Sequence, residues 1–282
     1  MIDTSFLKQL DKFNLVIKKR ITSSFTGDRK TQTLGSGLIF SGYDNYVPGN
    51  DFKLIDWKAY ARSDKLFVKR YEEDRNLTVH AIIDFSGSMN FGTKRKKYEY
   101  ASMIGLGFAY IALKNNERFV LSAFDKHLDF FKPSKGVRQI ASILNYLEHK
   151  KPEGETKLLD SLIQYKALIH SKALVIIISD FLCDIEDIKI ILHKFKRNKI
   201  KLIQVLDVVE TKMNVSGEFQ LEDLETHSTM DTFIDPFMKK QYFDKLEKHN
   251  AQIRRSCSEV GADFYSVSTG EDIFDVFYSI LG

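Results

Sequence analysis

The sequence predicts an α/β fold, in which a mostly parallel central sheet carries helices on both faces. From residue 77 onward, short apolar runs typical of buried strands alternate with segments whose apolar residues recur at helical spacing. The run ALVIIISDF at 173–181 is almost continuously apolar, as expected for a parallel strand that is covered on both faces. These two observations favour an open parallel sheet over an all-helical or all-β domain.

The individual elements follow from the same periodicities. Strands are expected at 77–85, 118–124, 128–131, 173–181, 200–208 and 262–267, of which 128–131 is a short edge strand. Helices are expected around 101–112, 185–195, 243–260 and 273–280. Between 209 and 235 the alternation lapses, and we predict a small hairpin insertion. The predicted organisation is an N-terminal extension, residues 1–75, that packs on a core domain of residues 76–282.

Composition and charge limit the classes of function. The 282 residues are 43% hydrophobic, and the net charge of +4 is too weak by itself to indicate nucleic-acid binding. The first residues lack the apolar stretch of a secretory signal, and no apolar run approaches the roughly 18 residues that span a bilayer. Cys183 and Cys257 cannot build a disulfide framework. We therefore expect a cytoplasmic protein that inserts into no membrane directly and binds no nucleic acid.

Oxygen-bearing side chains follow the strands at the expected carboxyl edge of the sheet. Asp84, Ser86 and Ser88 form a D-x-S-x-S pattern after the first strand, and Asp180 ends the central strand. Thr156 stands in a turn that enters a helix between these strands. Ligands of open parallel sheets bind at this edge, where the strand order reverses. Because alternate residues of an extended loop point the same way, we expect these five side chains to face a common point.

This set of donors predicts a divalent-metal site. Hard oxygen ligands without His or Cys suit Mg²⁺, or Mn²⁺ or Ca²⁺, rather than zinc. Only two carboxylates are supplied, while Mg²⁺ prefers about six oxygens, so waters and an outside carboxylate can complete the shell. Cys183 is expected to be a semi-buried thiol rather than a ligand. The alternative is that the Ser and Asp residues only cap helices and form turns.

The same residues carry a resemblance to a known family. D-x-S-x-S after the first strand, a Thr before a helix and S-D after the central strand resemble the metal-ion-dependent adhesion site of von Willebrand factor A domains. The segment YVPGNDFKLIDWKAYAR at 46–62 resembles the hallmark of bacterial von Willebrand A-like proteins catalogued as domain of unknown function fifty-eight. The resemblance extends from about residue 35 to the end and implies a Rossmann-like von Willebrand factor A domain.

The resemblance also implies a function, which is metal-dependent protein binding. Ser86 and Ser88 would ligate the metal directly, Asp84 and Asp180 would act largely through water, and Thr156 would bind directly or through water. An Asp or Glu of a partner protein would complete the shell. Such proteins are thought to act with MoxR-type AAA+ ATPases as chaperone-like adaptors, so an ATPase of that type is the expected partner.

Two other functions fit parts of the pattern. A metal-dependent phosphoester hydrolase would use Asp84, but Ser86 stands where related phosphatases carry a second Asp, and no Ser-His or Cys-His arrangement is suggested. A structural module would use the metal only to stabilise the loops. We therefore predict no catalytic residue and no enzymatic activity.

Two further groups of residues have competing interpretations. Asp56, Trp57 and Arg62 are candidates for a partner-binding surface, although we favour the interpretation that Trp57 packs on the sheet edge while Asp56 and Arg62 form an internal ion pair. The basic run Lys94–Lys97 follows the metal loop, and we expect it to shape the electrostatic field around an acidic partner.

Overall fold

The computed structural model describes residues 6, 9–10, 38–49, 51–73, 78–115, 117–125, 128–131, 139–152, 154, 158–222, 224 and 228–281. The chain divides into two compact units. One comprises Met1–Val16 and Leu77–Gly282, and the other comprises Ile17–Asn76.

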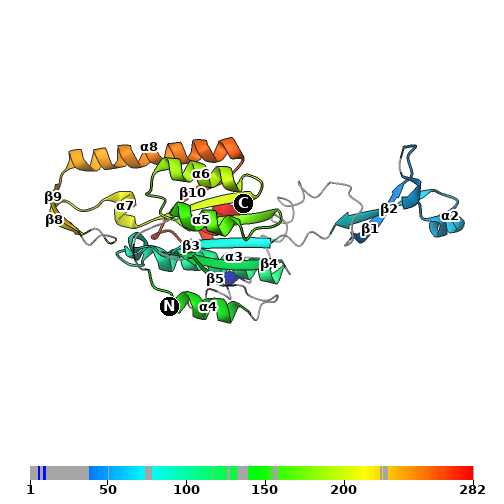
Figure 1. The fold of residues 1–282 in the computed structure, drawn as a ribbon, viewed down its shortest axis with the longest axis horizontal. Coiled ribbons are helices and arrows are strands. Elements are labelled where there is room, and N and C mark those ends of the chain that lie inside the picture. The colour runs from blue at the N-terminus through cyan, green and yellow to red at the C-terminus, as the bar shows by residue number, and fades with distance from the viewer. Residues whose placement is uncertain are drawn as a thin grey trace. The chain divides into compact units, whose positions relative to one another are not determined.

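The larger unit is built on a six-stranded sheet with the strand order β10-β7-β6-β3-β4-β5 (Figure 1). Of its strands, β5 alone is antiparallel to its neighbour. The predicted mostly parallel sheet is confirmed, and all six predicted strands are present. The strands are β3 (Thr78–Asp84), β4 (Arg118–Phe124), β5 (Leu128–Phe131), β6 (Ala173–Ser179), β7 (Lys199–Leu206) and β10 (Asp263–Ser268).

Helices cover both faces of this sheet (Figure 1). On one face, α5, α6 and α8 enclose a core that includes Ile82, Val175 and Leu202. On the other face, α3 lies against the sheet, where Gly105 brings its backbone close to Ile83, and Phe277 of α9 lies against Gly107. The helices are α3 (Lys97–Lys114), α4 (Ile140–His149), α5 (Leu158–Lys166), α6 (Ile185–Phe195), α7 (Val208–Lys212), α8 (Pro236–Val260) and α9 (Ile273–Leu281).

Two smaller features complete this unit. Strands β8 (Gly217–Glu222) and β9 (Thr229–Ile234) form an antiparallel pair within the segment predicted to hold a hairpin insertion. Near the N-terminus, Phe6 and Leu10 are buried, and the ring of Phe6 lies 5.7 Å from the ring of Phe274 in α9. Among the described residues, no helix combines the length and apolar content needed to cross a bilayer.

The smaller unit contains β1 (Leu38–Asn45) paired antiparallel with β2 (Phe67–Glu73), a 3-10 turn η1 (Phe52–Leu54) and helix α2 (Trp57–Ser63). Asp56 is the N-cap of α2 and accepts hydrogen bonds from the backbone N–H groups of Lys58 and Ala59. It also accepts a hydrogen bond from the hydroxyl of Tyr43 at 2.7 Å, which is the main cause that lowers the pKa of Asp56 to about 2.

One detail of our favoured interpretation of this segment, the ion pair, is wrong. The ion-pair partner of Asp56 is Lys69, at 3.4 Å, rather than Arg62. Trp57 is 60% exposed, and its ring meets the edge of the neighbouring Tyr60 ring, while its packing on the edge of the large sheet stays a prediction. A partner-binding role for Asp56, Trp57 and Arg62 stays a prediction.

Candidate metal and partner-binding site

Asp84 and Asp180 lie together at the point where the strand order reverses. β3 and β6 are neighbouring parallel strands, with Ile83 opposite Ile178. From β3 the chain continues to β4 on one side, and from β6 it continues to β7 on the other. Asp84 ends β3, Asp180 follows β6, and both are buried. This reversal is the position where open α/β sheets bind their ligands.

The loop after β3 is ordered around the carboxylate of Asp84. The backbone N–H of Ser86 donates to Asp84 Oδ1 at 2.8 Å, and the hydroxyl of Ser179 donates to Oδ2 at 2.5 Å. The hydroxyl oxygens of Ser86 and Ser88 lie 3.1 Å apart. Ser86 is the N-cap of the 3-10 turn η2 (Gly87–Asn90) but makes no capping hydrogen bond with its side chain. Helix capping therefore does not explain why a serine stands at position 86.

Asp84 is a carboxylate that lacks a cation. Its burial, and then the charge of nearby Asp180, raise the pKa of Asp84 to about 7. In the part of the chain that the structure describes, no Lys or Arg forms an ion pair with it, and its hydrogen bonds to Ser86 and Ser179 only partly offset the cost of burial.

Asp180, in contrast, is paired with a buried lysine. Lys97 Nζ lies 2.9 Å from Asp180 Oδ2 and 2.9 Å from Glu210 Oε1, and the lysine is only 1% exposed. Burial by itself lowers the pKa of Lys97, but its attraction to the two carboxylates is greater, so the net effect raises this pKa. Lys97 is therefore part of a buried cluster of charges, and the effect of Lys94–Lys97 on an acidic partner stays a prediction. Lys94, Arg95 and Lys96 remain exposed beside the site.

Polar groups of β7, α8 and the end of β6 itself fix the backbone that carries Asp180. The side-chain amide of Gln204 in β7 donates to the carbonyl oxygen of Asp180 at 3.0 Å. Phe181 adopts a left-handed conformation with φ of 50°, its N–H donates to the hydroxyl of Ser179, and its carbonyl lies 2.7 Å from His249 Nε2 of α8. Left-handed non-glycine residues are costly and occur often at binding sites, so the loop is held in place rather than relaxed.

Two further segments reach the D-x-S-x-S loop. The N–H of Gly87 donates to the carbonyl oxygen of Gly154 at 2.9 Å, which brings the turn before α5 to the site. Thr156, the predicted donor from that turn, lies outside the described residues. A Cβ atom placed on Gly87 would stand 2.6 Å from the carbonyl oxygen of Leu224, which lies between β8 and β9. Only glycine fits at position 87.

The donors fit a hard divalent cation, provided that hydroxyls and waters supply part of the shell. Within the described ranges, no three His, Cys, Asp or Glu side chains form a group that could hold a metal. An ion here would depend on Ser86, Ser88, Asp84 and outside oxygens, as is usual for Mg²⁺. Burial, followed by the charge of Asp180, raises the pKa of the Cys183 thiol to about 12, and hard divalent cations prefer oxygen to sulfur ligands.

The raised pKa of Asp84 predicts how the metal-free protein responds to pH. Below pH 3.8, the pKa of this carboxyl in the unfolded chain, Asp84 is protonated in both the folded and the unfolded state, and the stability that depends on it is fully present. As the pH rises through about 7, the buried group must ionise, and the folded state loses that stability. At about 1.4 kcal/mol per pKa unit, the loss is on the order of 4 kcal/mol. Urea unfolding in EDTA should show wild type losing stability from pH 5 to pH 8 relative to Asp84→Asn. Parallel pH profiles for the two proteins would contradict the assignment.

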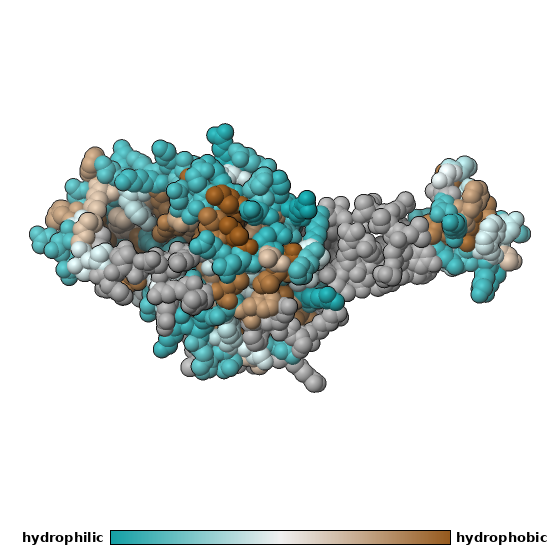
Figure 2. Space-filling model, in the orientation of Figure 1, coloured by the Kyte–Doolittle hydropathy of each residue, from teal (hydrophilic) through white to brown (hydrophobic). Residues whose placement is uncertain are grey.

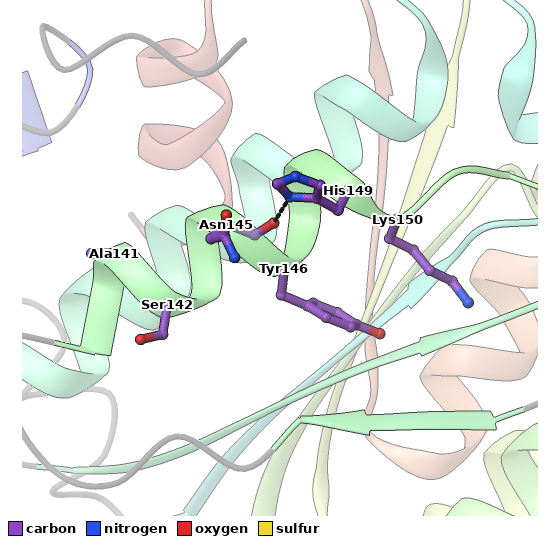
Figure 3. A pocket seen from close by; sticks show the side chains of 6 residues that line it. All are labelled: Ala141, Ser142, Asn145, Tyr146, His149 and Lys150. Carbon is purple, nitrogen blue, oxygen red and sulfur yellow. Dashed lines mark hydrogen bonds between the residues drawn. The ribbon is translucent and has the colours of Figure 1, made fainter.

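A hollow of about 700 Å³ lies along α4 (Figure 3). Within it, His149 Nδ1 lies 2.7 Å from the carbonyl oxygen of Asn145, and Lys150 forms ion pairs with Asp125 and Asp129. His149 and Lys150 thus both make polar contacts with neighbouring groups. The residues that line it are Ala141, Ser142, Asn145, Tyr146, His149 and Lys150.

Comparison with known sequences places the chain in a family. Residues 42–252 match the family described as "Protein of unknown function DUF58", which is more than half of the chain. The chain belongs to this family. The predicted family is thus confirmed. A curated relative of the chain is the Mycobacterium bovis protein Mb1516, which is 23% identical over 96% of this chain and 87% of its own length.

Solved structures similar to this chain include two that align with 72% of it. The protein BatB from Bacteroides thetaiotaomicron is 12% identical, with a TM-score of 0.45 over 96% of its own chain. The SpRpn10 VWA domain is 11% identical, with a TM-score of 0.43 over 94% of its own chain. The fold assignment here rests on the strand order and register of this chain's own sheet.

Proposed function

We propose that this chain is a divalent-metal-dependent protein-binding adaptor rather than an enzyme. A von Willebrand factor A-like fold suggests a protein-interaction module, and the family assignment is compatible with that role. Ser86 and Ser88 would ligate Mg²⁺, or Mn²⁺ or Ca²⁺, directly. Asp84 and Asp180 would hold waters and hydroxyls in place, and Thr156 is the proposed fifth donor.

The observation that carries this proposal is the pair of hydroxyls beside an uncompensated carboxylate. Two serine oxygens 3.1 Å apart can contact one ion together. Asp84, directly beside them in the chain, is fully buried, and its pKa is raised first by that burial and then by the negative charge of Asp180. A bound divalent ion would supply the missing positive charge and an electrophilic centre for a carboxylate ligand.

The partner is proposed to present an Asp or Glu to the metal. Lys97 already neutralises part of the negative charge of Asp180 and Glu210. The protein's own carboxylates would therefore leave a bound ion enough positive charge to attract a further carboxylate. Lys94, Arg95 and Lys96 are exposed beside the loop and would attract an acidic surface. By the resemblance to von Willebrand A-like proteins, a MoxR-type AAA+ ATPase is the proposed partner in chaperone-like assembly of protein complexes.

Metal binding is tested by isothermal titration of the metal-free protein with Mg²⁺, Mn²⁺ and Ca²⁺. We expect one saturable site, which Asp84→Ala removes while exposed Asp160→Ala in α5 leaves it intact. Absence of saturable binding for all three ions would refute the proposal. Metal binding that raises the melting temperature but changes no protein interaction would instead favour a structural role for the ion.

A further inference from the structure

In the described part of the chain, no third strand pairs with the β8–β9 hairpin. Among the described residues, β8 and β9 pair with each other and with no other strand. Each strand therefore offers one edge on which a further strand can form hydrogen bonds. A two-stranded hairpin is only marginally stable alone, and an added strand extends both its hydrogen bonding and its apolar contacts.

Large apolar side chains are exposed on the same hairpin. Phe219 is 37% exposed, Met230 58% and Phe233 62%, and Phe237 at the start of α8 is 68% exposed. Figure 2 shows light-brown apolar atoms among hydrophilic ones at the end of this unit where Figure 1 labels β8 and β9. The described residues that line a hollow of about 430 Å³ belong to the hairpin, among them Phe219, Thr232 and Phe233.

The two faces of the hairpin differ in chemistry. Glu218 lies opposite Phe233 and Gln220 lies opposite Asp231, so Glu218 and Asp231 share one face, which also carries Phe233. Phe219 lies opposite Thr232, which places Phe219 on the other face with Met230. A strand added to either edge would present alternate side chains to a face with both carboxylates and to a face without them.

The charge of the hairpin indicates which kind of partner can bind to it. From Met213 to Asp235 the sequence contains six Asp or Glu residues and no Lys or Arg, although the whole chain has a net charge of +4. A second copy of the hairpin would meet like charges, and charged residues on exposed edges are a known means of preventing self-pairing. A basic partner meets opposite charges on the same surface.

We propose that the β8–β9 hairpin is a docking surface for an extended basic segment of a partner protein, which adds as a strand to one of its edges. Lysine or arginine side chains of that segment contact Glu218 and Asp231, and its alternate apolar side chains contact Phe219 and Met230. The interaction needs no metal and is independent of the proposed function. Because Leu224 touches Gly87, a partner on the hairpin lies next to the D-x-S-x-S loop.

The test uses fluorescein-labelled ten-residue peptides and fluorescence anisotropy with the full chain in EDTA. A peptide in which Lys alternates with Val should bind saturably, and one in which Glu alternates with Val should bind at least about tenfold more weakly. The Lys–Val peptide N-methylated at alternate residues cannot form the strand hydrogen bonds and should also bind weakly. Equal binding of the N-methylated peptide, or no saturable binding of the Lys–Val peptide, would overturn the proposal.

Matched charge reversals locate the surface. Glu218→Lys with Asp231→Lys should weaken binding of the Lys–Val peptide at least about tenfold. Glu247→Lys with Glu259→Lys makes the same change in net charge at exposed positions of α8 and should leave binding unchanged. Phe219→Ser should weaken binding without altering charge. If both double variants weaken binding equally, the attraction is non-specific and the hairpin is not the docking surface.

Discussion

Replacing Lys97 with methionine is expected to lower the free energy of unfolding by about 3–5 kcal/mol, because it leaves Asp180 and Glu210 as buried carboxylates without a cation. In a domain of this size, the change corresponds to a fall in melting temperature of roughly 10 °C or more. Mg²⁺ is expected to raise the melting temperature of this variant more than that of wild type, since the ion supplies positive charge close to Asp180. Calorimetric unfolding in EDTA and in Mg²⁺ measures both effects.

The matched control for this substitution is Lys189→Met. Lys189 pairs with Glu186 at 2.6 Å on the exposed surface of α6, where an ion pair contributes about 0–1 kcal/mol. The Lys189→Met protein should have a melting temperature within a few degrees of wild type, and Mg²⁺ should change that temperature as it does for wild type. If Lys97→Met proves as stable as the control, the Lys97 ion pairs do not hold the site together.

The second large effect is expected from Ser86→Ala combined with Ser88→Ala. Removing both hydroxyls leaves the proposed ion without its direct protein ligands, so the affinity for Mg²⁺ should fall by roughly 100-fold or more. The metal-free variant should fold normally, because Ser86 makes no capping hydrogen bond with its side chain and the loop is held through backbone groups. Isothermal titration gives the affinity, and circular dichroism in EDTA checks the fold.

Ser142→Ala is the control for the loss of a hydroxyl, since Ser142 is exposed on α4 away from the loop after β3. Its Mg²⁺ affinity should equal that of wild type. Unchanged Mg²⁺ affinity in the Ser86→Ala, Ser88→Ala protein would place any bound ion elsewhere.

The sheet and the two carboxylates at its edge were predictable from sequence. Strands such as Ala173–Ser179 are so continuously apolar that no other environment suits them, and parallel strands bring their carboxyl ends to one edge. Asp84 and Asp180 therefore had to lie near each other once their strands were neighbours. Strand order itself depends on contacts between distant segments, which periodicity does not report.

Lys97 and Glu210 were missed for a physical reason. Lys97 stands in a run of basic residues, and such runs are usually solvated. The feature that could have revealed the ion pair is the position of Lys97 in the first turn of α3. The helix dipole disfavours a cation there, so a lysine at this position indicates a nearby anion that compensates for it. Its partner Glu210 lies 113 residues away, and nothing local indicated that contact.

The ion-pair partner of Asp56 was missed as well. Lys69 lies on β2, and its contact with Asp56 depends on how separate segments pair, which sequence periodicity does not report.

The most direct measurement of the central claim is capture of partners from the native cell lysate with the tagged chain, in Mg²⁺ and in EDTA, alongside the Ser86→Ala, Ser88→Ala and Ser142→Ala proteins. We expect specific partners that are lost in EDTA and in the double variant but kept by Ser142→Ala. Partners retained in EDTA and by the double variant would show that protein binding does not pass through a metal at this site.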